Sequence, residues 1–177
     1  MLTAVVVTIF IITKELGWSI GEAIGQIQES DMSKIFYWDW GSPKFFPKQF
    51  ISGALIAIVM TGLDQDMMQK NLTCRNLKEA QKNIFGFSVV LIFANLLFLG
   101  MGALLFMYAN SKGIEIPART DTLYPLLALN HLGTFAGVVF LLGIIAAAYS
   151  SADSALTALT TAFCVDFLNF EKKEEEE

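Results

Sequence analysis

The sequence predicts an all-α, polytopic helical membrane protein. Hydrophobic residues occupy 54% of its 177 positions, only 16% are charged, and the mean hydropathy is positive. Two long stretches, residues 84–109 and 132–152, contain no charged side chain. Each can cross the hydrocarbon layer of a membrane, which is ~30 Å thick and requires about 20 helical residues. These stretches and the composition together define the class.

The first segment, residues 1–12, is apolar but shorter than a full span. It also lacks the basic region and the small-residue cleavage site of a signal peptide. We therefore expect a truncated span, the end of a membrane helix whose beginning lies outside this chain. Such a span implies that the chain is a fragment of a longer protein.

Residues 13–49 are expected to form a polar outer loop with a short amphipathic helix near its start. The aromatic run 36–40 follows this helix, and Pro43 and Pro47 come after the run. Aromatic side chains gather where a membrane meets water. The run is therefore either an interfacial anchor or part of an outer gate or lid. The expected apolar face of the short helix comprises Trp18, Ile20, Ala23, Ile24 and Ile27.

The next expected span, residues 50–69, is apolar only in its first part and becomes polar at Asp64 and Gln65. At about 1.5 Å per residue the apolar part is too short to cross a membrane. Short apolar helices mark binding sites in transporters, and acids inside a membrane are costly enough to indicate function. The alternative is that Asp64 and Asp66 already lie at the cytoplasmic interface, near Lys70.

The distribution of basic residues predicts the topology. They are denser in loop 70–83 than in loops 13–49 and 110–132. The positive-inside rule therefore places loop 70–83 and the tail 166–177 in the cytoplasm and the two longer loops outside. The basic residues of the short loop are Lys70, Arg75, Lys78 and Lys82.

The two remaining expected spans are residues 84–109 and 133–165. Asn95, in the first, is expected to hydrogen-bond a neighbouring helix. Outer loop 110–132 includes an apolar insert, 123–129, which is expected to form a short surface helix. Because the last span is longer than a bilayer is thick, its lower half projects into the cytoplasm or the helix tilts strongly.

Several function classes find no support in the composition. The formal charge of −5 owes four acids to the terminal run 174–177, and no basic patch with interleaved aromatics indicates nucleic acid. Cys74 and Cys164 form neither a disulfide framework nor a metal cluster. No histidine-rich cluster and no Gly-x-Ser-x-Gly turn indicate an enzyme. The expectation is a protein without catalytic activity and without a nucleic-acid partner.

The polar stretch within the last span is the strongest candidate for a site. On a helix, the hydroxyls of Ser150 and Ser151 lie three and four residues after Ala147, over the same turn as its carbonyl. Three oxygens converging on one patch suit a hard cation. The alternative is a helix-packing seam, because small and hydroxylated residues also allow membrane helices to approach each other. Such a seam would comprise Gly143, Ala147, Ser150, Ser154, Ala158 and Thr161.

Two segments resemble the sodium:solute symporter family, which includes relatives of the sodium/glucose, proline, pantothenate and sialic-acid symporters. Asp64-Gln65, followed by Gln69-Lys70, resembles the Asp-Gln…Gln-Arg segment at the cytoplasmic end of core helix 6. Ala147-Ala-Tyr-Ser150-Ser151, with Asp166 further along, resembles core helix 8 and its sodium site, Na2.

This resemblance implies a LeuT-type fold of two inverted five-helix repeats, of which the chain supplies the end of core helix 5 and helices 6, 7 and 8. It assigns Na⁺ ligation to the Ala147 carbonyl and to the hydroxyls of Ser150 and Ser151, with further oxygens from core helix 1. Met60 and Thr61 stand where sugar-carrying relatives have an aromatic pair, which argues against a stacked hexose. The implied substrate-binding positions are Met60, Thr61, Asp64 and Gln65.

The resulting expectation is part of a sodium-coupled secondary transporter that moves a small solute by alternating access. Its partners would be the solute, the lipid bilayer and the remaining helices of the transporter. The protein would lie in the cell membrane, expected to be a bacterial inner membrane, and would cross it several times. The alternative is a non-transporting helical scaffold or assembly subunit whose Ser and Thr residues only pack helices.

Overall fold

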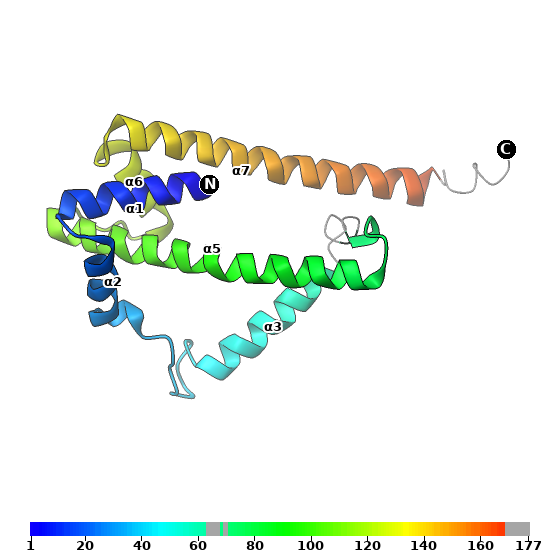
Figure 1. The fold of residues 1–177 in the computed structure, drawn as a ribbon, viewed down its shortest axis with the longest axis horizontal. Coiled ribbons are helices and arrows are strands. Elements are labelled where there is room, and N and C mark those ends of the chain that lie inside the picture. Colours follow the sequence, from blue (N-terminus) through cyan, green and yellow to red (C-terminus); the bar gives the residue numbers. More distant parts are fainter. Residues whose placement is uncertain (63–67, 69–70, 169–177) are drawn as a thin grey trace. The chain divides into compact units, whose positions relative to one another are not determined.

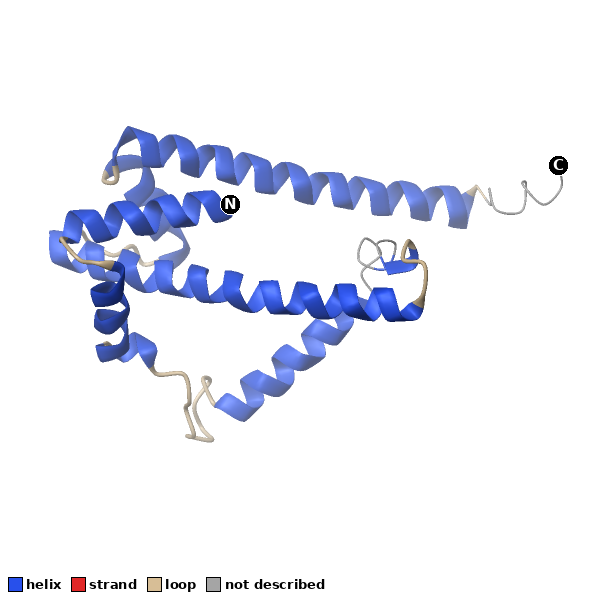
Figure 2. Cartoon of the chain, in the orientation of Figure 1, coloured by secondary structure: helices blue, strands red, loops and turns tan. Residues whose placement is uncertain are grey.

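The computed structural model describes residues 1–62, 68 and 71–168. Helices dominate this part of the chain, and none of its residues lies in a β-strand (Figure 2). The all-α prediction is therefore confirmed for the described residues. Figure 1 shows the order of the elements along the chain.

Among the described residues, two helices are long and apolar enough to cross a membrane. They are α5 (Leu77–Lys112) and the helix over Gly133–Val165, which consists of α7 (Gly133–Ala162) and the first residues of the π-helix η3 (Phe163–Phe167). Helix α5 begins before the apolar stretch of the sequence, because Asn76 caps its first turn. The side-chain oxygen of Asn76 accepts a hydrogen bond from the Glu79 amide at 2.9 Å.

The chain divides into two compact units, Met1–Phe46 with Gly86–Ala146 and Pro47–Phe85 with Ala147–Glu177. We refer to them as unit 1 and unit 2. Each unit takes part of α5 and part of α7, so the boundaries fall inside these two helices.

In unit 1, α1 (Leu2–Leu16) and α2 (Ile20–Glu29) meet at an angle of 86°. The bend has a local cause. Gly17 adopts a left-handed conformation (φ 71°), and its amide and that of Trp18 donate to carbonyls in the last turn of α1. Together, the two helices are apolar enough to form one broken span or a re-entrant segment.

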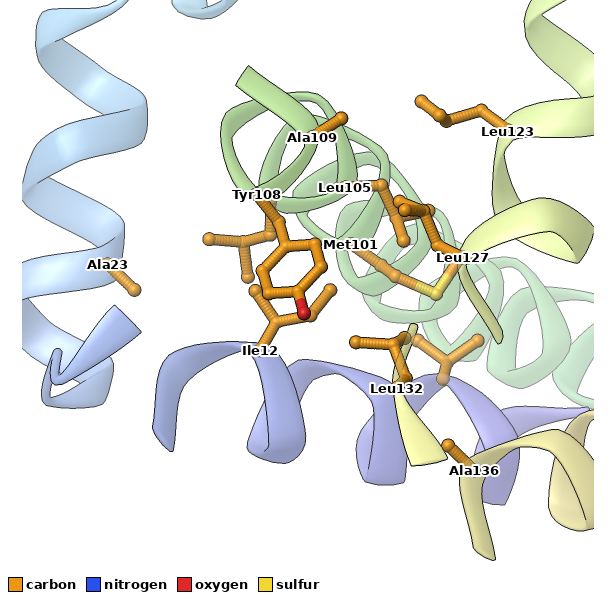
Figure 3. Close-up of a cluster of buried hydrophobic side chains, with 12 residues drawn as sticks. Ile12, Ala23, Met101, Leu105, Tyr108, Ala109, Leu123, Leu127, Leu132 and Ala136 are labelled. Carbon is orange, nitrogen blue, oxygen red and sulfur yellow. The ribbon is translucent and has the colours of Figure 1, made fainter. Parts of the chain in front are cut away.

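The core of unit 1 lies where α1, α5, α6 (Leu123–Asn130) and the start of α7 meet (Figure 3). Ile12 and Leu127 are completely buried there, and the Tyr108 ring belongs to the same cluster. The expected surface helix at 123–129 is thus present as α6, but it is packed into the core rather than lying on the surface. The buried core residues are Val5, Ile12, Ala23, Met101, Leu104, Leu105, Tyr108, Ala109, Leu123, Leu127, Leu132 and Ala136.

The prediction of which residues form the buried face of the amphipathic helix, here α2, is only partly correct. Ala23 is buried and Ile27 packs against the core, but Ile20 and Ile24 are 67% and 53% exposed. The sharp turn at Gly17 directs α2 away from α1, so only a narrow strip of α2 reaches the core of unit 1. A periodic pattern cannot reveal how wide the contacting strip is.

Polar contacts also hold unit 1 together. The hydroxyls of Thr8 and Tyr124 lie 2.9 Å apart and link α1 to α6. Burial raises the pKa of Tyr124, while the hydrogen bond with Thr8 acts in the opposite direction. At the other end of α1, Glu15 accepts a 2.7 Å hydrogen bond from the Tyr108 hydroxyl and lies 3.5 Å from the Lys112 ammonium.

Unit 2 contains α3 (Phe46–Gly62) except for its first residue, the beginning of α5 and the second part of α7. The apolar side chains of α3 are exposed on every face, from Phe50 at 65% to Met60 at 63%. A helix that is apolar all round is normally covered by lipid or by other helices.

Two short 3₁₀ helices, η1 (Asp31–Ser33) and η2 (Thr120–Thr122), complete the described elements of unit 1.

Candidate functional site

The candidate sodium-site residues lie in the middle of α7. Ala147, Ser150 and Ser151 belong to one uninterrupted helix, so the three occupy one turn, as the spacing predicts. The turn forms because the surrounding sequence is apolar and rich in alanine, a strong helix former. The carbonyl of Ala147 has a second lone pair beyond the one used within the helix. One main-chain oxygen and two hydroxyls are therefore available within a single turn.

The hydroxyls of Ser150 and Ser151 differ in their bonding from those of Thr13 and Thr161. Thr161 donates to the Thr157 carbonyl at 2.9 Å, and Thr13 donates to the carbonyls of Ile9 and Phe10. Within the described residues, neither Ser150 nor Ser151 has such a partner. Both serines are exposed and Ala147 is half-buried. Their oxygens remain available for a ligand or for another helix.

The part of α7 that lies in unit 1 uses a small residue for packing. A Cβ added to Gly143 would lie 3.3 Å from the Ala4 Cβ and 3.4 Å from the Met1 sulfur. A close approach of two helices at a small residue, here of α7 to α1 at Gly143, is typical of a helix-packing seam. The seam interpretation therefore has direct support at Gly143, one helical turn before Ala147.

The helix ends in a feature that spacing does not predict. Residues Phe163–Phe167 form a single π-helical turn, in which the rings of Phe163 and Phe167 stack with their centroids 5.6 Å apart. Such turns are rare and often occur at functional sites. Asp166, the acidic residue of the resemblance, lies in this turn, and its side chain is outside the described part.

The four implied substrate positions are only partly described. Met60 lies near the end of α3 and is 63% exposed. Thr61 belongs to the same helix, but its side chain is outside the described part, and Asp64 and Gln65 fall outside the described residues altogether. The structure therefore locates one of these four side chains.

A metal site of the common acidic or histidine type is not apparent. Among the described residues there is no group of three or more His, Cys, Asp or Glu side chains that could hold a metal ion. The candidate cation ligands on α7 are instead neutral carbonyl and hydroxyl oxygens.

Comparison of the chain with protein-family models, with curated proteins and with solved structures gives no match. The class that the fold supports, over the part of the chain that the structure describes, is an all-α protein with two candidate membrane spans.

Proposed function

We propose that this chain is part of a sodium-coupled secondary transporter of the sodium:solute symporter type, located in the cell membrane. The observation that carries the proposal is the turn of α7 that holds Ala147, Ser150 and Ser151 within a candidate membrane-spanning helix. Neutral oxygens on a membrane helix can replace part of the hydration shell of Na⁺. Hydroxyls without partners in the described residues are suited to this role.

The proposed site is half of a complete one. A hard cation takes about six or more oxygen ligands, and the turn of α7 offers three. The rest would come from other helices of the transporter, arranged in a LeuT-type fold of two inverted repeats. The exposed apolar surface of α3 supports this proposal, because such a surface requires lipid or neighbouring helices to cover it.

Coupling would follow from differential binding. If Na⁺ binds the outward-open state more tightly than the inward-open state, its binding shifts the population toward outward-open. Rigid-body rocking would then separate the α7 oxygens from those of the facing helix and release the ion inside. The chemistry is limited to ligand exchange, so no covalent step and no enzymatic activity are proposed.

The solute is proposed to be small and to bind near the end of α3. Its contacts would include Met60, Thr61, Asp64 and Gln65. Because Met60 and Thr61 are not aromatic, they offer no ring face on which a hexose could stack.

The test is sodium-dependent uptake by the full-length transporter carrying Ser150→Ala and Ser151→Ala together. Removing two of the ligands should raise the Na⁺ concentration for half-maximal uptake at least tenfold, which corresponds to about 1.4 kcal/mol or more. Thr161→Ala is the matched control, because the Thr161 hydroxyl already donates to a carbonyl on the same helix. Unchanged sodium dependence in the double variant would contradict the assignment.

A second candidate is a non-transporting scaffold whose small residues only pack helices. The close approach of Gly143 to Ala4 supports it, because a small residue there lets α7 pack tightly against α1. This alternative expects mild effects of both serine substitutions and no stabilisation by sodium.

A further inference from the structure

Residues 34–46, which we call the aromatic loop, form a closed loop in unit 1. The Phe46 amide donates to the Tyr37 carbonyl at 2.8 Å and ties the two ends of the loop together. At its tip, the Ser42 amide donates to the Asp39 carbonyl, and the Asp39 carboxylate accepts from the Gly41 amide at 3.2 Å. These bonds give the segment a defined backbone path.

The aromatic rings of the loop pack against one another. Phe46 contacts Phe36 and Trp38, with ring centroids 4.8 Å and 6.0 Å away, and Trp40 lies 5.1 Å from Phe45. The outer faces of these rings are nevertheless uncovered: Trp38 is 70% exposed and Trp40 is 85% exposed. The loop thus holds two large amphipathic side chains outward on an ordered base.

Two lysines lie beside the remaining ring. The ammonium nitrogens of Lys34 and Lys44 are 5.0 Å and 5.5 Å from the centroid of Tyr37. Within the described residues neither lysine forms an ion pair, and the nearby Asp39 carboxylate is used by Gly41. Two positive charges are therefore held at the loop and are available for an anionic partner.

The loop leads directly into an apolar helix, because Phe46 is also the first residue of α3. Exposed tryptophans, lysines beside an aromatic ring and an adjoining apolar helix are typical of a membrane–water interface. This combination favours lipid over solvent as the surroundings of the loop.

We propose that the aromatic loop binds the headgroup region of the bilayer, with Trp38 and Trp40 beside the upper acyl chains and with Lys34 and Lys44 paired with lipid phosphate groups. Lipid phosphates provide the negative charge that the two ammonium groups lack. The inference concerns the lipid partner alone and is independent of sodium binding.

The first experiment locates the tryptophans in the membrane. The chain has three tryptophans, so Trp18→Phe leaves only those of the loop. This variant is reconstituted into phosphatidylcholine vesicles, and only protein that resists alkaline extraction is measured. Phosphatidylcholine brominated near the glycerol end should quench the fluorescence at least twice as strongly as lipid brominated near the methyl end. Acrylamide in the water should quench it weakly.

The control is the Trp38→Phe, Trp40→Phe double variant, in which Trp18 reports alone. Trp18 is half-buried against the core of unit 1, so neither bromolipid should quench it as strongly. Strong quenching of the loop tryptophans by acrylamide, without quenching by bromolipid, would overturn the proposal and indicate a water-facing gate or lid.

The second experiment tests the lysines. Lys34→Gln and Lys44→Gln together, in the Trp18→Phe background, should reduce quenching by the shallow bromolipid about twofold in vesicles that contain phosphatidylglycerol. Lys14→Gln is the matched control, because Lys14 is an exposed lysine on α1, outside the loop. Equal quenching in the double variant and its parent would overturn the role assigned to the lysines. Neither experiment includes a transport step, so the loop proposal and the sodium proposal can fail separately.

Discussion

Single residues show where the packing of unit 1 is tightest. At Gly143 a side chain would meet Ala4 and Met1 at once, whereas a Cβ at Gly100 on α5 would meet nothing within 4 Å. The same residue type therefore has different consequences at two positions in helices that are both candidate spans. Spacing in the sequence does not distinguish the two glycines, because the difference depends on a partner distant in the sequence.

We predict that Gly143→Leu destabilises unit 1 by about 1–3 kcal/mol, because the new side chain must displace α1. Gly100→Leu, its matched control, should stay within about 0.5 kcal/mol of the parent or gain slightly, since leucine favours helices more than glycine does. The measurement is the free energy of unfolding in mixed micelles titrated with a denaturing detergent. Equal losses in the two variants would contradict the tight contact at Gly143.

The residues of the candidate site were partly accessible from the sequence. Helical spacing correctly predicts that Ala147, Ser150 and Ser151 share one turn. Spacing does not predict that Ser150 and Ser151 are exposed while Thr161 donates to its own helix. Hydroxyl rotamers respond to local surroundings, and a complete ligand set depends on segments distant in the sequence.

Elements show where local signals determine helix ends. Ser19 and Glu22 form a capping box at the start of α2: the Ser19 amide donates to the Glu22 carboxylate at 2.6 Å, and the Glu22 amide donates to the Ser19 hydroxyl. The hydrogen bond from the Ser19 amide lowers the pKa of Glu22 below its usual value of 4.5. The charged carboxylate also interacts favourably with the positive end of the helix dipole.

We predict that Ser19→Ala frays the first turn of α2, with a loss of about 1 kcal/mol in local stability. Because the pKa of Glu22 is lower in the folded protein, its contribution is present above pH 4.5 and is lost as the pH falls through the lowered pKa. The measurement is hydrogen exchange of the α2 amides, which should become about fivefold faster. Glu29→Gln, at the opposite end of α2, should leave the first turn unchanged, and equal exchange in Ser19→Ala and the parent would contradict the role of the cap.

Longer elements follow from hydropathy, but their shape does not. The uncharged stretches correctly mark α5 and α7, because a run of apolar residues of that length forms a helix in any membrane setting. The 86° turn between α1 and α2 and the π-helical turn at Phe163–Phe167 are not encoded in such patterns. The first depends on the left-handed conformation of Gly17, and the second on local packing of side chains around the helix end.

At the scale of the whole molecule, the chain combines one packed unit with large apolar surfaces. Unit 1 has a buried core to which α1, α5, α6 and α7 contribute, while α3 in unit 2 is exposed on all faces. A soluble monomer rarely exposes apolar patches of that extent. The exposure of α3 agrees with a membrane setting, in which lipid or further helices cover it.

The proposed sodium site makes a prediction at this scale through linkage. A ligand that binds only the folded state stabilises it by about 2.7 kcal/mol at a concentration 100 times its dissociation constant. If the proposal is correct, the full-length transporter, with both halves of the site, should therefore melt at a higher temperature in NaCl than in KCl of equal concentration. The 177-residue chain alone should melt equally in the two salts, because the α7 turn offers only three of the required oxygens. The difference should disappear in the full-length Ser150→Ala, Ser151→Ala variant and persist in Thr161→Ala. A sodium-specific shift that survives in the double variant would place the ion elsewhere, since linkage requires that the groups responsible for the shift be those that bind the ion.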